Sequence, residues 1–381
     1  MRLLRRMAAM KILFLRRNMA AMKILALLLG CHGFMRPPMR RPGALLRAKE
    51  TDTEYERFCE FNGGMWRGKC RSVLVDALRK EASRDPQCDG RRYTSCVKAS
   101  KAGVDEALSW DDEDNETVVS LKLPPGAVTG DFDGSFSAEH AAHNLVSASA
   151  PTFAAEAGLA VADDERVRVV ASYDGCGSLA RVAYLDEVRI GANARVNGAA
   201  VADVGDVFAL AGDWKGDATI RKPGRGAVNV LKQDLELHTD GDRLFRALTV
   251  YDAAGDAVQK LESFGDVATA SLDADFEFVV FRDVGCCLVL SRGAYVLAPL
   301  SIEREKAFYI EAGVFITEPE ADLPGGQQLP ISIRGAVPDE NGDVEPDFSE
   351  SKRFLSRSVR LYSPDRTLAS VTTSYHQLYS S

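Results

Sequence analysis

The stretch Leu210–Asp217 (LAGDWKGD) is the most informative part of the sequence, because its pattern is already present one domain length earlier in Phe61–Lys69 (FNGGMWRGK). Both stretches read Gly-x-Trp-x-Gly. A tryptophan at this position can close one end of a small β-barrel, while the flanking glycines let the first strand bend and approach neighbouring backbone. The structural anchors of two such barrels would be Trp66, Gly68, Trp214 and Gly216.

Strand signals fill the rest of the chain. Arg166–Tyr173 alternates, Asp174-Gly175 is a turn signal, and Ser178–Leu185 alternates again, which predicts a β-hairpin. Further predicted strands are Leu244–Tyr251, Ala257–Leu261, Phe276–Phe281, Cys286–Leu290, Tyr295–Ala298, Ala307–Ala312, Ser356–Tyr362 and Ala369–Tyr375. Helical signal is thin and centres on Glu54–Phe61. Evenly spaced short strands of this kind predict an all-β fold of two tandem, lipocalin-like (calycin) antiparallel β-barrels with little helix.

The matched openings also predict the domain limits. The N-terminal barrel would occupy residues 55–203 and the C-terminal barrel residues 204–381. Within the second barrel, Pro319–Asp347 is rich in Pro, Gly and acids and too long for a tight hairpin, so we expect a loop insertion there.

The first 47 residues hold eleven Arg and Lys and no Asp or Glu. A short apolar run, Ile24–Gly30, precedes small residues, so residues 1–33 read as a signal peptide. Residues 34–47 begin with Phe34 and are basic and Pro-interrupted, as transit peptides are. This two-part leader predicts delivery to the plastid stroma, and a plain secretory signal is the alternative.

Charge excludes several classes of partner. The whole chain carries a formal charge of −8, and removing the basic leader makes the remainder more acidic still. Nucleic acid and anionic membranes are bound by basic surfaces, so we expect neither as a partner and no membrane span. Seven cysteines follow the leader without a CxxC spacing, which favours buried free thiols over a zinc site or a disulfide framework, although a regulatory Cys59–Cys70 disulfide stays open.

Catalytic and metal-binding motifs are scarce. His140 and His143 have a helical ligand spacing but lack the remaining ligands, and no phosphate loop, dinucleotide fingerprint or nucleophile elbow is present. We therefore expect no catalytic residues, no metal and no cofactor. One set of charged residues in the second half is a candidate binding cluster, namely Arg292, Glu311, Arg357 and Arg360. An exposed salt-bridge group on strand ends is the interpretation we favour for it.

The C-terminal third carries a family resemblance. Val284–Pro299 (VGCCLVLSRGAYVLAP), Phe308–Gly313 (FYIEAG), Arg357–Tyr362 (RSVRLY) and Ser370–Thr372 follow one another. In this order they resemble the plant and cyanobacterial family named after the biogenesis factor required for chloroplast ATP synthase. The two Gly-x-Trp-x-Gly stretches are similar to the openings of that family's barrels.

The resemblance implies a non-enzymatic stromal factor that assists assembly of the ATP synthase catalytic head, with the head subunits as its partners. The alternative is a calycin-type carrier or lyase-like protein that binds a tetrapyrrole, a carotenoid or another small apolar ligand in a barrel. An open apolar barrel and a co-purifying pigment would favour that alternative.

Overall fold

A computed structural model describes residues 58–100, 103–111, 119–123, 128–130, 136–138, 153–162, 164–191, 200–201, 211–222, 226–252, 254–267, 276–303, 305–317 and 353–380. A short helix occupies residues 58–62, where helical signal was expected, and all 21 named elements are β-strands. The predicted all-β, calycin-like fold class is confirmed. Within the part of the chain described, no helix has the length and apolar character needed to cross a membrane. The leader and the segments 140–143 and 319–347 lie outside the described residues.

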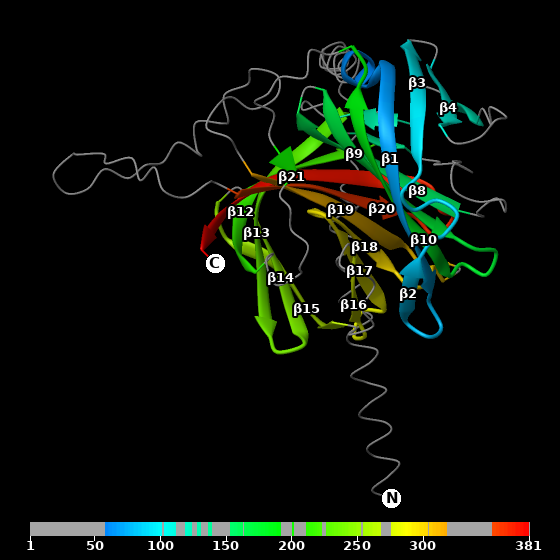
Figure 1. Cartoon of the computed structure of the whole chain (residues 1–381). Helices are drawn as coiled ribbons and strands as arrows, with labels where there is room; N and C mark the ends of the chain where they lie inside the picture. Colours follow the sequence, from blue (N-terminus) through cyan, green and yellow to red (C-terminus); the bar gives the residue numbers. More distant parts are fainter. Residues whose placement is uncertain are drawn as a thin grey trace, which may run out of the picture. The chain divides into compact units, whose positions relative to one another are not determined.

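The first sheet is open over the described residues (Figure 1). Its strands run in the order β5-β4-β3-β1-β10-β9-β8-β7-β6, with β2 paired to β1. Their bounds are β1 Gly64–Asp76, β2 Glu81–Arg84, β3 Arg92–Ser100, β4 Gly103–Trp110, β5 Val119–Leu123, β6 Val128–Gly130, β7 Phe136–Ala138, β8 Phe153–Ala162, β9 Glu165–Tyr173 and β10 Leu179–Arg189. Every described pairing is antiparallel, and none joins β5 to β6, so the sheet has the form of a half-barrel there.

The second sheet closes on itself. Strands β12 to β21 pair successively in a ring that β12–β21 and β19–β20 complete, and the short β11 pairs with the end of β19. Their bounds are β11 Ala200–Val201, β12 Gly212–Lys222, β13 Gly226–Asp240, β14 Arg243–Tyr251, β15 Ala257–Val267, β16 Glu277–Phe281, β17 Cys286–Ser291, β18 Ala294–Pro299, β19 Phe308–Thr317, β20 Arg353–Tyr362 and β21 Leu368–Ser380. Each strand predicted from alternation in this half coincides with one of these elements, apart from shifted ends.

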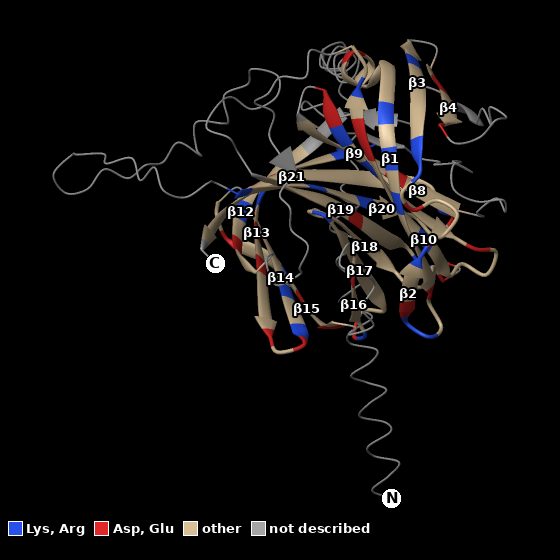
Figure 2. Ribbon diagram, viewed as in Figure 1, with Lys and Arg blue, Asp and Glu red and all other residues tan. Residues whose placement is uncertain are grey.

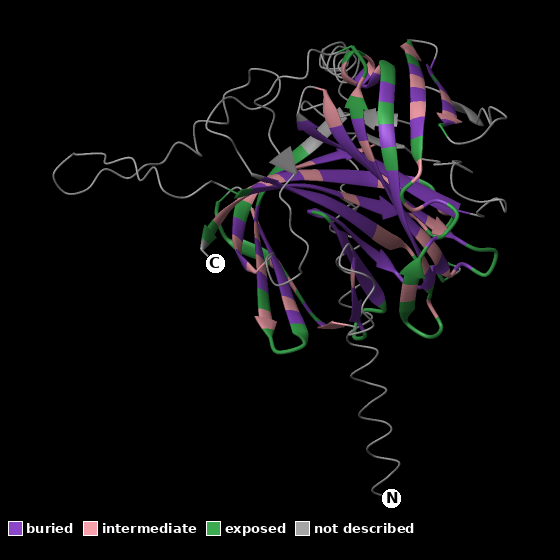
Figure 3. Cartoon of the chain, viewed as in Figure 1, coloured by how far each residue is buried: buried purple, intermediate pink, exposed green. Residues whose placement is uncertain are grey.

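The closed barrel buries roughly alternate side chains along β12, β13, β15 and β21, and most side chains along β14 and β16 to β20. Leu235, Leu237, Leu244 and Leu248 alternate with more polar neighbours and form an interior cluster with Trp214. Strands β17 and β18 differ, because all of their residues are buried (Figure 3). Both faces of these two strands must therefore be covered.

The half-barrel covers the outer face of the closed barrel. One continuous apolar cluster combines residues of the first sheet, including Val73, Val169 and Tyr184, with Val289 and Val296 of the second. Hydrogen bonds also cross the boundary between the two sheets. The hydroxyl of Tyr184 donates to the carbonyl oxygen of Val289 at 2.6 Å, and the hydroxyl of Tyr173 donates to the carbonyl oxygen of Pro299 at 3.0 Å. The backbone amide of Leu179 donates to the carbonyl oxygen of Leu300 at 2.9 Å. The chain from residue 47 onward forms one compact unit.

The cysteines behave largely as predicted. Cys286 packs in the interior cluster of the closed barrel, and Cys287 packs in the cluster between the two sheets, so the adjacent thiols do point to opposite faces. All seven described cysteines are free, and Cys70 and Cys88 are buried. The alternative disulfide between Cys59 and Cys70 is not formed, because the two residues belong to different parts of the first sheet's core.

Candidate functional site

A charged cluster lies inside the closed barrel, centred on Glu311 of β19. Arg246 of β14 donates from Nη2 to Glu311 Oε2 at 2.7 Å, and Arg357 of β20 donates from Nη2 to the same oxygen at 2.9 Å. The hydroxyl of Tyr295 donates to Glu311 Oε1 at 2.7 Å. Arg357 Nη1 also donates to Gln233 Oε1 at 3.0 Å, which ties β13 to the cluster. Side chains of β14, β18 and β20 therefore converge on the carboxylate of Glu311 on β19, which is fully buried.

The electrostatics fix the charge state of this cluster. Burial alone would raise the pKa of Glu311, but the charges of Arg246 and Arg357, with their hydrogen bonds and that of Tyr295, hold it well below its ordinary value. Burial raises the pKa of Tyr295 far above its usual range, and the charge of Glu311 adds to this effect. Glu311 is therefore ionised and the tyrosine neutral at physiological pH.

His376 of β21 lies in the same interior. Its register partner on β20 is Leu355, a member of the interior cluster. Neither ring nitrogen has a hydrogen-bond partner among the described residues. Burial, with the charge of Arg357 nearby, lowers the pKa of His376 to about 3, so the imidazole is neutral at physiological pH.

The four residues of the predicted binding cluster do not all come together as one group. Glu311 and Arg357 are bound to each other inside the barrel. Arg360 lies opposite Ile310 and Val371 in register, both of which belong to the cluster between the sheets, so Arg360 occupies the outer face of the same barrel wall. Arg292 is exposed in the tight turn between β17 and β18, with a φ of 44°.

The favoured interpretation of this cluster, an exposed salt-bridge group on strand ends, is wrong for three of its four members. Glu311, Arg357 and Arg360 are each at most 2% exposed. The physical reason is that barrel closure turns β19 and β20 into central strands, covered on the inside by the core and on the outside by the first sheet. Burial lowers the pKa of Arg360 from its ordinary value.

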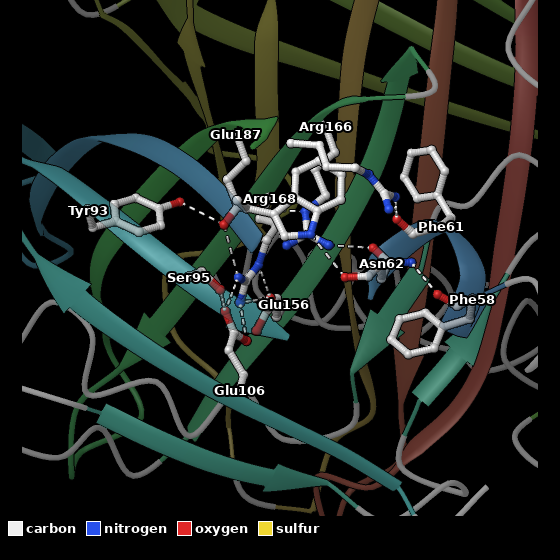
Figure 4. Close-up of polar contacts among 12 residues, drawn as sticks. Phe58, Phe61, Asn62, Tyr93, Ser95, Glu106, Glu156, Arg166, Arg168 and Glu187 are labelled. Atoms are coloured by element: carbon white, nitrogen blue, oxygen red, sulfur yellow. Dashed lines mark hydrogen bonds and ion pairs between the residues drawn. The ribbon is translucent and has the colours of Figure 1, made fainter. Parts of the chain in front are cut away.

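A second buried network lies on the first sheet, on the face turned away from the closed barrel (Figure 4). Arg168 Nη1 donates to Glu106 Oε1 at 2.6 Å, and Arg168 Nε donates to Glu156 Oε1 at 2.6 Å. Glu187 lies 3.3 Å from Arg168 Nη1 and also accepts the hydroxyl of Tyr93 at 2.9 Å. Charges of Glu106, Glu156 and Glu187 together outweigh the desolvation of Arg168 and raise its pKa.

This network continues to the short helix through Arg166. Its Nε binds Glu187 Oε2 and its Nη1 donates to Asn62 Oδ1 at 2.6 Å, while the guanidinium lies 4.0 Å from the ring centroid of Trp66. Trp66 Nε1 donates to the carbonyl oxygen of Asn62 at 3.0 Å. The first tryptophan anchor is thus held by a cation–π contact and by the helix that precedes its strand.

The other anchors are also buried or closely packed. Trp214 lies inside the closed barrel, 5.3 Å from the ring of Phe315. A side chain at Gly216 would collide with the carbonyl oxygen of Tyr375 on β21, and one at Gly68 would collide with the ring of Tyr93. The two halves share one further feature, a glycine two residues before each tryptophan (Gly64, Gly212) with a φ of 115° and 144° respectively. Only glycine adopts this conformation without strain.

The chemistry open to these networks is limited. A general base works best with a pKa near the operating pH. Glu311 and His376 are both shifted far below that range, and the carboxylates around Arg168 are already engaged with it. Among the described residues no group of three or more His, Cys, Asp or Glu side chains is placed to hold a metal ion. The ion pairs of these networks join different strands of each sheet.

Several residues of both networks escaped the sequence analysis. In the closed barrel they are Arg246, Tyr295, Gln233 and His376, and in the open sheet Arg166, Arg168, Glu106, Glu156 and Glu187. The sequence did contain a signal for Arg246. Leu244 and Leu248 occupy interior positions of an alternating strand, and Arg246 lies between them on the same face. A charge at an interior position predicts a buried partner.

The fold and its buried networks define a double calycin-like protein, with one sheet that is open over its described residues and one closed sheet packed together. Residues 204–321 match the family "Biogenesis factor required for ATP synthase 1, C-terminal domain", so the resemblance predicted from the sequence is confirmed for this part of the chain. No curated protein matches the sequence.

Solved structures support the fold. A protein of unknown function from the DUF3598 family of Nostoc punctiforme PCC 73102 is similar with a TM-score of 0.55 and 16% identity, over 86% of this chain and 99% of that chain. Transferrin binding protein B from Haemophilus parasuis Hp5 is 11% identical over 82% of this chain and 75% of that chain, with a TM-score of 0.22. The same protein from serogroup B Neisseria meningitidis gives 9% identity, 83% and 76% coverage and a TM-score of 0.22. The first likeness concerns the fold alone, and the other two are too distant to carry an argument.

Proposed function

We propose that this chain is a non-catalytic assembly factor of the plastid stroma that assists assembly of the ATP synthase catalytic head. The observation that carries the proposal is the match of residues 204–321 to the C-terminal domain of a family described as a biogenesis factor required for ATP synthase. The basic, acid-free leader of residues 1–47 supports the plastid location.

The buried networks are consistent with a scaffold. Each buried Arg–Glu group joins strands that are distant in sequence, as Arg246, Glu311 and Arg357 do. Such groups are compatible with a rigid fold that presents its surfaces to a partner. The proposed partners are the ATP synthase head subunits.

A capture experiment tests this function. Residues 48–381 would be immobilised and exposed to plastid stroma, with bound proteins and pigments identified together. The control is the same chain with Trp66→Ala and Trp214→Ala together, whose combined cost of about 6–10 kcal/mol is comparable to the whole free energy of unfolding of a typical domain. We expect ATP synthase head subunits on the unsubstituted chain alone and no pigment on either.

The carrier alternative predicts another result. Recovery of a tetrapyrrole, carotenoid or lipid without head subunits would make the protein a carrier and would overturn the assembly role.

A further inference from the structure

The N-terminal part of β1, residues 64–69, lies beyond the boundary between the two sheets and is exposed on one face. Odd-numbered residues of β1 share one face, and on this face Val73 and Val75 pack against the closed barrel. Further toward the start of the strand the same face carries Met65, Arg67 and Lys69, all exposed. The exposed face is therefore a direct continuation of the surface that already binds the second sheet, and Figure 3 shows that exposed and buried residues both occur along β1.

Neighbouring strands widen this face. In register, Arg67 stands between Val188 of β10 and Thr94 of β3, and Lys69 stands opposite Arg92 of β3. Val188 is 44% exposed, Ile190 40% and Met65 49%. We call the set of these side chains the β1 stripe, which comprises Met65, Arg67, Lys69, Arg92, Val188 and Ile190.

Arg67, Lys69 and Arg92 supply the cations of the β1 stripe. Among the described residues neither Arg67, Lys69 nor Arg92 takes part in an ion pair. Asp186 faces Lys69 in register, but its carboxylate is held by Arg71 at 2.6 and 2.7 Å. Glu165, next to Val188, is the acid that borders the stripe on β9. Figure 2 shows the basic bands on β1 and β3.

This sign of charge is opposite to that of the whole protein. The chain carries a formal charge of −8, so it repels large polyanions such as nucleic acid and anionic membranes. A short acidic segment of a partner protein experiences mainly the local cations, because salt screens charges beyond about 8–10 Å. Three unpaired cations beside three exposed apolar side chains fit a segment that alternates carboxylates with apolar residues.

We propose that the β1 stripe is the docking surface for an acidic, partly apolar segment of a partner protein. The inference rests on the proposed function only for the identity of that partner. Electrostatic complementarity of this kind mainly raises the association rate and confers salt dependence, while the apolar side chains slow dissociation.

Charge reversal on the intact mature chain tests the proposal. The stripe variant carries Arg67→Glu, Lys69→Glu and Arg92→Glu. The matched control carries Lys215→Glu, Lys232→Glu and Lys260→Glu, three exposed lysines of the closed barrel, and so has the same net charge. The probe is a labelled synthetic peptide of alternating Glu and Leu, and the same peptide with Lys in place of Glu tests charge specificity.

We expect the wild-type chain and the control variant to bind the acidic peptide, more weakly as salt rises, and to ignore the basic peptide. The stripe variant should bind the acidic peptide at least about tenfold more weakly. Equal binding by stripe variant and wild type, or no binding by wild type, would overturn the proposal. So would a wild-type dimer that the stripe substitutions dissociate, because a second copy would then occupy the surface.

The peptide assay and the capture experiment fail independently. Loss of head-subunit capture with intact peptide binding would remove the proposed function and leave the docking surface. Intact capture of head subunits by the stripe variant, with no peptide binding by the wild type, would remove the docking surface and leave the proposed function.

Discussion

The two halves of the molecule solve the same folding problem in different ways. The second sheet closes through β12–β21 and β19–β20, so its strands satisfy one another's backbone hydrogen bonds. The first sheet is open over its described residues and rests one face on the closed barrel. Both halves begin with a buried tryptophan and both contain buried Arg–Glu groups. Closure, rather than the sequence pattern at the opening, distinguishes them.

The charge balance of the two networks also differs. Inside the closed barrel two arginines face one glutamate, whereas on the open sheet Arg166 and Arg168 face Glu106, Glu156 and Glu187. Loss of one carboxylate should therefore destabilise the closed barrel more than the open sheet.

Separating the halves should have the largest effect. Residues 48–203 expressed alone would expose the apolar face formed by Val73, Val169 and Tyr184, so we expect no cooperative unfolding transition and strong binding of a hydrophobic dye. Co-expression with residues 204–381 should restore solubility. A cooperative, dye-free unfolding transition of residues 48–203 alone would contradict this dependence on the closed barrel.

The tryptophans should be equally important in both halves. Trp66→Ala and Trp214→Ala each remove a buried side chain and should lower the free energy of unfolding by about 3–5 kcal/mol. Chemical denaturation followed by circular dichroism measures both. A Trp66→Ala chain within about 1 kcal/mol of the unsubstituted chain would show that the open sheet does not depend on its anchor.

Removing one carboxylate should lower the free energy of unfolding by different amounts in the two networks. Glu311→Gln leaves Arg246 and Arg357 buried without a counter-charge and should cost about 3 kcal/mol or more. Glu106→Gln leaves two carboxylates beside Arg168 and should cost about 1 kcal/mol. The comparison is made by urea denaturation at neutral pH, and equal costs would refute the difference in charge balance.

Acidification should act on the closed barrel through His376. Its folded pKa of about 3 lies below the unfolded value of about 6.5, so between these values the unfolded chain binds a proton that the folded chain does not. The free energy of unfolding attributable to His376 is thus fully present above about pH 6.5 and falls as pH decreases, by at most about 1.4 kcal/mol per pH unit. Urea denaturation between pH 8 and pH 5 measures this slope.

One variant isolates the histidine: His376→Gln should flatten the slope between pH 8 and pH 5. A slope that persists in His376→Gln would show that other groups cause it. Glu311, whose folded pKa is depressed, adds its own loss of stability only as pH falls below about 4.3.

Much of the fold could be predicted because its signals are local. Leu244–Tyr251 alternates within a few residues, and β14 spans Arg243–Tyr251. The seam between the sheets was not predicted, although Cys286–Ser291 is apolar at nearly every position, as strands buried on both faces are. Closure itself joins β12 to β21, which are distant in sequence, and no local pattern encodes it.

The candidate cluster could be predicted only in part. Arg357 and Arg360 are three residues apart on one strand and must point to opposite faces, so the sequence already argued against their meeting. Glu311 and Arg357, two members of the candidate cluster, form an ion pair, but Arg246 and His376 come from strands whose place in the ring depends on closure. Glu311 and Arg357 are buried because the barrel closes around them, whereas Arg360 is buried because the first sheet packs on the outer face of the barrel, which the sequence analysis did not include.

The most direct test of the central claim, that this protein acts by binding ATP synthase head subunits, is native mass spectrometry of residues 48–381 mixed with those purified subunits. We expect a stable complex of unmodified chains, and a free protein whose mass equals that of the polypeptide alone. A free protein that carries the added mass of a small ligand, together with no complex, would contradict it.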